Sequence, residues 1–270
     1  MWRRMKHTYQ TRRLFGRRAA FVPPLHLMHD GPIGYQEFKD NGEEFMRYYV
    51  EIGGLKPDER MLGVASGIGR KTWPLVAYLS GRGSYDGIDI VKSGVDWCRE
   101  RYTSEYPNFR FQHIDVYNKH YNPEGSCQAS EYEFPFPDEH FDFVVLNSVF
   151  THMLAEEVEN YLSEIARVLR PGGRSLITFF LLNAESLELI ESGRSTVDLR
   201  EQFGPARTIS RETPELAVGY DINFVISLYE KNGLEVKQPI HFGSWCGRSD
   251  YLSYQDLVMA IKPRPLPDRD

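Results

Sequence analysis

The sequence is poor in the residues that mark several classes of protein. It contains three cysteines, Cys98, Cys127 and Cys246, and no two of them form a CxxC pair. This spacing argues against a disulfide framework and a cysteine zinc site, and it favours a reducing compartment such as the cytoplasm. No apolar run approaches the roughly 20 residues that span a bilayer. The basic N-terminus lacks the apolar segment of a secretory signal.

The sequence also has no large excess of charge of either sign. The net charge is −6, from 32 basic and 38 acidic residues, which argues against nucleic acid as a partner. The 270 residues, 41% of them hydrophobic, suit one domain with room for an insertion. Only the start of the chain is strongly basic, with no acid before Asp30. We interpret residues 1–33 as a solvated tail, with weak contact to an anionic membrane surface as the alternative.

A glycine-rich turn follows a short apolar strand predicted at residues 60–64. The turn contains Gly67 and Gly69, which can take positive φ and let backbone N–H groups approach a ligand closely. The amphipathic segment after the turn, which contains Trp73 and Leu79, predicts a helix. The N-terminus of that helix would add donors and partial positive charge. Strand, turn and helix together predict a site for a nucleotide-like cofactor.

Two common nucleotide-binding motifs do not match this turn. The dinucleotide fingerprint needs glycine or alanine three positions after its second glycine, where this chain has Thr72. A P-loop needs four residues between its glycines, and that spacing is also absent. A nicotinamide-dependent oxidoreductase therefore stays only as an alternative to other cofactor-dependent enzymes.

Acidic residues stand at the ends of the second and third predicted strands, residues 84–91 and 109–114. Asp89 follows the glycine turn by about 20 positions, where an acid can accept from both hydroxyls of a ribose; the alternative is a helix cap. Asp115 could accept from an exocyclic amine, or it could cap a turn. His113, Asp115 and His120 also suggest a metal site, but His120 lies in the following loop, so we expect no metal.

Predicted strands alternate with predicted helices along most of the chain. The apolar run 141–147 is typical of a strand buried on both faces, and residues 155–169 repeat apolar side chains at helical spacing. The alternation predicts an α/β fold with a doubly wound, mostly parallel sheet and helices on both faces. The other predicted elements are a helix at 34–54, a strand at 174–182, an insertion at about 183–220, a helix at 221–232, and closing strands at 234–242 and 255–262. These elements define a domain at 34–262 and a C-terminal tail at 263–270.

Candidate residues for an acceptor follow the strand at 141–147. Ligands of doubly wound sheets bind at the carboxyl ends of the strands, so Asn147, Ser148 and His152 should lie at the edge that carries the glycine turn. An imidazole can be neutral near pH 7 and act as a general base, which makes His152 the catalytic candidate; packing at a helix start is the alternative. In the closing loop, Trp245 and Arg248 could contact an acceptor or fasten the loop to the sheet.

These motifs together resemble the class I S-adenosylmethionine-dependent methyltransferases. The residues that carry the resemblance are 62–70, 85–89, Asp115-Val116, 134–142, 148–153 and 167–173. The resemblance implies a seven-stranded sheet with the last strand antiparallel, and S-adenosyl-L-methionine as the cofactor. It implies that the glycine turn holds the methionine part, Asp89 the ribose and Asp115 the adenine. The implied cofactor-binding residues are Ala65, Ser66, Gly67, Gly69, Asp89, Ile90, Asp115, Val116, Asn147 and Ser148.

Two positions depart from the pattern of that family. The family usually has an acidic residue where this chain has Gly63, and a glycine where it has Ala65. Loss of the acid removes a charge-assisted contact to the cofactor's ammonium group, worth roughly 1.5–3 kcal/mol. We therefore expect weakened binding, or compensation by another acid or by backbone carbonyls. The expected activity is O-methylation of a polar small molecule or a sugar or glycan hydroxyl; the alternative is a non-catalytic scaffold or regulatory module with the same fold.

Overall fold

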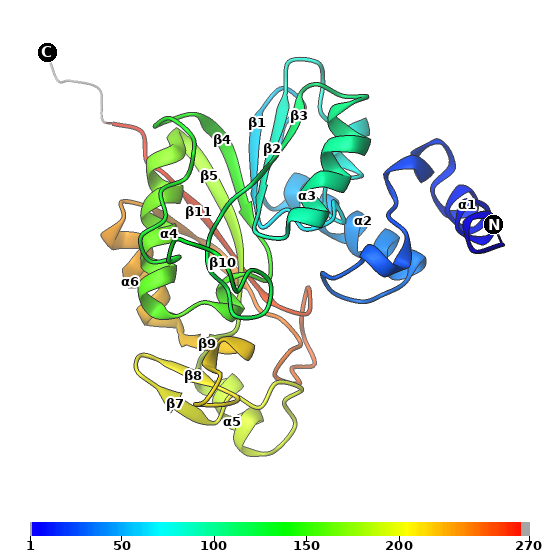
Figure 1. Ribbon diagram of the computed structural model, residues 1–270. Helices are drawn as coiled ribbons and strands as arrows, with labels where there is room; N and C mark the ends of the chain where they lie inside the picture. The colour runs from blue at the N-terminus through cyan, green and yellow to red at the C-terminus, as the bar shows by residue number, and fades with distance from the viewer. Residues whose placement is uncertain (1, 266–270) are drawn as a thin grey trace, which may run out of the picture. The chain divides into compact units, whose positions relative to one another are not determined.

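The computed structural model describes residues 2–265, with side chains from His7 onward. The chain divides into two compact units, Met1–Ser126 and Cys127–Asp270 (Figure 1). The predicted C-terminal tail, residues 263–270, falls mostly outside the described part. None of the described helices is long and apolar enough to cross a membrane.

Seven strands form a sheet in the order β10-β11-β5-β4-β1-β2-β3. Their bounds are Arg60–Val64 (β1), Ser84–Asp89 (β2), Phe109–His113 (β3), Phe141–Leu146 (β4), Leu169–Phe179 (β5), Glu235–His241 (β10) and Asp256–Ile261 (β11). Strand β2 runs parallel to β1 and β3, and β4 runs parallel to β5. Strand β11 is antiparallel to both β5 and β10. The predicted doubly wound, mostly parallel sheet with an antiparallel last strand is therefore confirmed.

In the first unit, α2 (Tyr35–Glu51) packs against the segment that follows the glycine turn. A Cβ atom on Gly42 would lie 2.3 Å from Nε1 of Trp73 and 2.6 Å from the carbonyl oxygen of Arg70, so only glycine allows this approach. Helix α3 (Lys92–Cys98) continues as a π-helical turn (Arg99–Thr103) and packs on β2 and β3. The helix that the sequence predicts at residues 34–54, beside the glycine turn, is therefore confirmed as α2.

The N-terminal region is structured rather than a solvated tail. Helix α1 (Trp2–Phe15) is followed by a 3-10 helix (Gly16–Phe21) and a second 3-10 turn (Leu25–Leu27). The ring of Phe15 is buried and lies 5.1 Å from the ring of Trp73 and 6.1 Å from that of Phe38. The prediction missed this because it weighed the charge of the segment and not its few apolar residues, which reach the core of the unit.

The helix predicted after the glycine turn does not form. Residues 70–80 make successive turns and one short 3-10 helix (Leu75–Ala77). Pro74 lacks a backbone N–H and its ring disfavours a helical residue before it. Trp73 and Leu75 are nevertheless buried. The apolar spacing therefore predicted correctly that these side chains are buried, but it did not predict the backbone conformation. The argument from a helix N-terminus beside the turn is therefore wrong.

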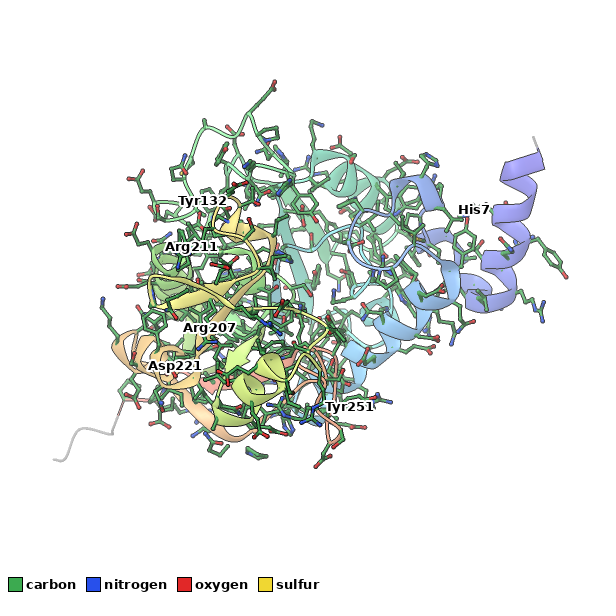
Figure 2. All side chains as sticks on the ribbon, turned by 90° about the horizontal axis from the view of Figure 1, so that it is seen from below. His7, Tyr132, Arg207, Arg211, Asp221 and Tyr251 are labelled. Carbon is green, nitrogen blue, oxygen red and sulfur yellow. The ribbon has the colours of Figure 1, made fainter. Side chains whose placement is uncertain are left out.

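The second unit has β4 and β5 in its core, with α4 (Ala155–Val168) packed on β5 and α6 (Ile222–Lys231) packed on β10 (Figure 1). Every residue of β4 is buried, as its apolar run predicts. The side chain of Asp221 begins α6 by accepting from the backbone N–H groups of Asn223 and Phe224 (Figure 2).

The predicted insertion is a small subdomain with its own core. Helix α5 (Ala184–Glu191) and a 3-10 turn (Pro214–Leu216) accompany a four-stranded sheet in the order β6-β9-β8-β7. Its strands are Leu181–Leu182 (β6), Glu201–Phe203 (β7), Ala206–Thr208 (β8) and Val218–Asp221 (β9). The buried cluster of this region is Phe180, Leu182, Leu189, Ile190, Leu199, Ala217, Trp245 and Cys246. The strands are too short to show a clear alternation in sequence.

Candidate functional site

The glycine-rich turn follows the carboxyl end of β1, and every second residue in it has a left-handed backbone conformation. The φ angles are 56° at Ala65, 58° at Gly67 and 83° at Gly69. Two of the three positions are glycine, which takes such angles without strain, whereas alanine does not. The N–H of Ser66 donates to the carbonyl of Ile88 at 3.0 Å. This bond fixes the turn against the end of β2.

Asp89 completes this tie between the turn and β2. Its Oδ2 accepts from the backbone N–H of Gly67 at 2.7 Å, and its Oδ1 accepts from the N–H of Val91 at 2.7 Å. Burial raises the pKa of the carboxyl, and these two donors partly oppose the rise. The helix cap that the sequence left as an alternative is not formed, because the residue that precedes α3 is Val91 and no side chain caps the helix. Each oxygen has a second lone pair, so the same carboxylate can also accept from a ribose.

A segment that the sequence did not assign to the site lies against the same turn. A Cβ atom on Gly67 would meet Oδ2 of Asp30 at 2.3 Å, and one on Gly94 would meet the ring of His29 at 3.0 Å. The Oδ1 of Asp30 pairs with Nη2 of Arg70 at 3.3 Å. No local motif marks residues 28–31; the only signal in the sequence is that Asp30 is the first acid of a basic segment.

The space beside Gly63 is already filled. A Cβ atom there would lie 2.0 Å from the hydroxyl oxygen of Tyr85. Tyr85 stands on β2 opposite Met61 and is buried, and burial raises the pKa of its hydroxyl. The large side chain of Tyr85, on the neighbouring strand, therefore occupies the place that an acidic side chain at position 63 would need.

Asp115 lies just after β3 and is exposed. Its carboxylate accepts from the hydroxyl of Ser126 at 2.5 Å, and this bond lowers the pKa of the carboxyl. Val116 beside it is buried. Nε2 of His113 lies 3.1 Å from the carbonyl oxygen of Ile90, and it donates to that oxygen when it carries the imidazole hydrogen. Among the described residues, no group of three acidic, histidine or cysteine side chains is arranged to hold a metal.

In the second unit, His152 ends a 3-10 turn (Phe150–His152) that follows β4. Its Nδ1 lies 3.0 Å from the carbonyl oxygen of Glu215 in the insertion. A carbonyl can only accept, so Nδ1 carries a hydrogen, and in the neutral imidazole Nε2 then has the lone pair. The hydroxyl of Tyr220 donates to the carbonyl of Met153 at 2.6 Å. Two bonds therefore tie the insertion to the segment that contains the candidate base.

Ser148 takes a left-handed conformation at the end of β4, with φ of 60°. Its N–H donates to the hydroxyl of Thr178 at 2.7 Å, and its own hydroxyl donates to Gln255 at 3.0 Å. Asn147 before it is half-buried. These bonds fix the backbone at the point where the predicted cofactor and acceptor residues begin.

The structure gives Trp245 and Arg248 the second of their two predicted roles. The indole of Trp245 is fully buried, and its Nε1 donates to Oδ2 of Asp256 at 2.7 Å. Arg248, with 4% of its side chain exposed, pairs with Glu185 at 2.7 Å and reaches Asp256 at 3.5 Å. Both side chains are engaged in bonds within the protein, and their assignment as substrate residues stays a prediction. They fasten the closing loop, and burial raises the pKa of Asp256 to about 6.

The first unit has the features that a nucleoside cofactor with an amino-acid group requires. The left-handed turn has backbone without a side chain at its two glycines, and Gly67 has no room for a side chain. Asp89 lies beside it with carboxylate oxygens that are able to accept from a hydroxyl, and Asp30 adds a second carboxylate. The methyl group of Ala65 is exposed in this turn. The donor and acceptor set therefore fits S-adenosylmethionine, apart from the ordinary acidic residue at position 63.

Comparison with known proteins agrees with this geometry. A family described as a methyltransferase domain matches residues 62–177, from β1 to β5. This match and the curated relatives confirm the predicted resemblance to the class I S-adenosylmethionine-dependent methyltransferases. The magnesium protoporphyrin IX methyltransferase of Synechocystis, solved with bound S-adenosylhomocysteine, has a TM-score of 0.53 at 15% identity over 88% of this chain and 91% of that one. Its likeness supports the fold.

Curated relatives match half of this chain or less. A ubiquinone/menaquinone biosynthesis C-methyltransferase of Ectopseudomonas mendocina is 29% identical over 134 residues, 50% of this chain and 46% of that protein. A fatty-acid O-methyltransferase of Mycolicibacterium smegmatis is 34% identical over 95 residues, 35% of this chain and 28% of that protein. The chain thus spans about half or less of the length of these relatives, which methylate different kinds of acceptor.

Proposed function

We propose that this protein transfers a methyl group from S-adenosylmethionine to a hydroxyl group of a small molecule. The observation that carries the proposal is the bond from the glycine turn to Asp89, at 2.7 Å from the N–H of Gly67. It joins the two elements that must act together on the methionine and ribose parts of one ligand. The family match over residues 62–177 supports the same assignment.

Each candidate residue then has a separate task toward the cofactor. We infer that the turn residues Ala65, Ser66, Gly67 and Gly69 hold the methionine part, and that Asp89 and Ile90 hold the ribose. Asp115 and Val116 would hold the adenine through one exposed carboxylate and one apolar side chain. Bound S-adenosylmethionine supplies a methyl group that its sulfonium already activates, so the chain's own residues mainly position the reactants and exclude water.

His152 would act as the general base. The acceptor oxygen would take the methyl group, and the electron pair of the broken carbon–sulfur bond would stay on sulfur. The hydroxyl proton passes to Nε2 of His152, which is free to take it because Nδ1 is bound to the Glu215 carbonyl at 3.0 Å. General-base assistance of this kind contributes roughly 10²–10⁴-fold. Asn147 and Ser148 would line the path between the two reactants.

The acceptor would be a polar small molecule or the hydroxyl of a sugar or glycan. Two features of the second unit support an acceptor site formed with the insertion: the Tyr220–Met153 bond and the contact of His152 with Glu215. The closing loop adds two exposed aromatic side chains, Tyr251 (Figure 2) and Tyr254, which offer both an apolar ring and a hydroxyl.

The basic N-terminal region is proposed to contact an anionic surface, such as that of an acidic membrane. Helix α1 and the turn after it expose Arg12, Arg13, Arg17 and Arg18. A cavity of about 730 Å³ lies beside them, with His7 (Figure 2) and Arg101 also in its wall. Vesicles with and without phosphatidylserine test the proposal. Binding only to the acidic vesicles, lost in Arg12→Glu/Arg17→Glu, would support it, and equal binding to both would refute it.

Calorimetric titration with S-adenosylmethionine and S-adenosylhomocysteine tests the proposed function. Micromolar binding of both, followed by radiolabelled methyl transfer to one member of a hydroxyl-bearing acceptor panel, would support it. Failure to bind either ligand would refute it. Binding without transfer to any acceptor class would favour the alternative, a regulatory module that keeps the fold; the strained Ala65 is the observation in favour of that alternative.

A further inference from the structure

An acidic side chain from outside the glycine turn lies on the backbone of that turn. Oδ2 of Asp30 is so close to the Cα of Gly67 that a Cβ atom there would lie 2.3 Å from the oxygen and 3.0 Å from the carboxyl carbon. Gly67 also has a φ of 58°, which disfavours any other residue. The turn and the carboxylate are therefore fitted to each other.

Arg70 holds the carboxylate in this place. Its Oδ1 pairs with Nη2 of Arg70 at 3.3 Å, and the side chain of Arg70 is 1% exposed and stacks 5.1 Å from the ring of Phe38. Nearby, the hydroxyl of Tyr102 lies 3.2 Å from two carbonyl oxygens, those of Phe21 and Gly69. Tyr102 thus joins the N-terminal segment to the turn itself.

The position of Asp30 leaves it able to meet a ligand. A quarter of its side chain is exposed, so the carboxylate is neither sealed in the core nor free in solvent. Among the described residues no group donates a hydrogen bond to Oδ2, whereas Oδ1 accepts from Nη2 of Arg70. The pKa of Asp89 is raised mainly by burial and, to a smaller extent, by the negative charge of Asp30. The two carboxylates therefore act on the same small region.

We propose that Asp30 supplies the acid that the family carries at position 63, and that its Oδ2 accepts from the ammonium group of the cofactor's methionine part. This inference depends on the proposed function, because it assigns a residue to the same cofactor. It explains how the chain can dispense with an acid at Gly63, where Tyr85 now fills the space. Arg70 is a positioning residue that orients Asp30.

Three ligands separate this role from a merely structural one. S-adenosylmethionine and S-adenosylhomocysteine carry the amino-acid group, and 5′-methylthioadenosine carries the adenosine and thioether without it. Asp30→Asn should weaken calorimetric binding of the first two by about 10- to 100-fold, the range of a charge-assisted hydrogen bond. Binding of methylthioadenosine should change less than about threefold, since it makes no bond to Asp30.

A matched control and a second variant keep the test decisive. Asp40→Asn removes an exposed carboxylate of α2 that accepts from Gln36, and it should leave all three affinities unchanged. Because Asp30→Asn leaves Arg70 buried without its partner, it can unfold the protein. Asp30→Asn/Arg70→Gln removes both charges and should show the same selective loss with the fold retained.

The outcomes distinguish this inference from the proposed function. Equal weakening of all three ligands would mean that Asp30 only supports the turn, and unchanged binding would mean that it has no role; either result overturns the inference. If the wild-type protein binds none of the three ligands, the proposed function itself fails. Selective loss in the two amino-acid ligands is the result that establishes Asp30 as an ammonium-binding residue.

Discussion

The hydroxyl of Tyr85 occupies the space into which a side chain at Gly63 would project, with 2.0 Å between that oxygen and a Cβ atom built on the glycine. The two residues lie on neighbouring parallel strands, and Tyr85 pairs with Met61, two positions before Gly63. An acid cannot be restored at position 63 by itself. Gly63 and Tyr85 are one structural feature, and they must be changed together.

Restoring the acid therefore requires a double variant. Gly63→Asp alone should destabilise the protein by about 1–3 kcal/mol, because overpacking forces side chains and backbone to shift. Gly63→Asp/Tyr85→Val opens the space and should recover S-adenosylmethionine binding in an Asp30→Asn background. Thermal unfolding and calorimetry measure the two effects. If Gly63→Asp alone folds with unchanged stability, the steric relationship is not as described.

Ala65 should be a source of strain. A left-handed conformation costs an L-residue roughly 1–2 kcal/mol, and glycine's extra flexibility in the unfolded chain costs about 0.5–1 kcal/mol. Ala65→Gly should therefore stabilise the protein by up to about 1 kcal/mol, seen as a higher denaturant midpoint. It should also improve cofactor affinity, since the exposed methyl group leaves the turn. Ala77→Gly, in an ordinary 3-10 turn, should destabilise instead. Equal effects of the two substitutions would contradict this prediction.

The free energy of unfolding should fall as pH rises from about 4 to about 6, because Asp256 loses its proton in this interval. Its pKa is about 6 in the folded protein, above the ordinary value of 3.8, because it is buried. The folded state then binds more protons than the unfolded state in this interval, so the stabilisation is complete below pH 4 and lost above pH 6. At about 1.4 kcal/mol per pKa unit, the loss is about 3 kcal/mol.

Asp256→Asn removes this titration and supplies the control. The variant keeps only one side-chain oxygen, so either Trp245 or Gly243 loses its acceptor, and the protein should be less stable at every pH. The difference in unfolding free energy between wild type and variant should nevertheless shrink between pH 4 and pH 6. Urea titrations at several pH values measure it. A difference that is constant with pH would show that Asp256 does not titrate in this interval.

His152→Gln should reduce turnover without loosening the cofactor. The amide cannot accept the acceptor's proton, so kcat should fall by about 10²- to 10⁴-fold, while calorimetric affinity for S-adenosylhomocysteine stays the same. Glu215→Ala is the control, because it keeps the backbone carbonyl that binds Nδ1 and should retain most activity. Full turnover in His152→Gln would remove the general-base assignment.

Much of the central sheet can be read from the sequence because each strand carries its own signal. The buried run of β4 and the alternation of strands with α2, α3 and α4 need no distant partner to be recognised. The same local logic fails where one residue changes the backbone, as Pro74 does after the glycine turn. It also fails in the insertion, where strands of two to four residues depend on the cluster around Trp245.

The sequence by itself determined the residue types at the cofactor site: the glycine turn, Asp89 about 20 positions after it, and the family that these residues resemble. Only the tertiary structure decided that Tyr85 fills the space beside Gly63 and that Asp30 lies against Gly67. Asp30 is 37 positions from Gly67 and Tyr85 is 22 positions from Gly63, so no local spacing connects them. Their contacts arise because the sheet and the N-terminal segment fold onto one turn, and packing between distant segments leaves no periodic mark in a single chain.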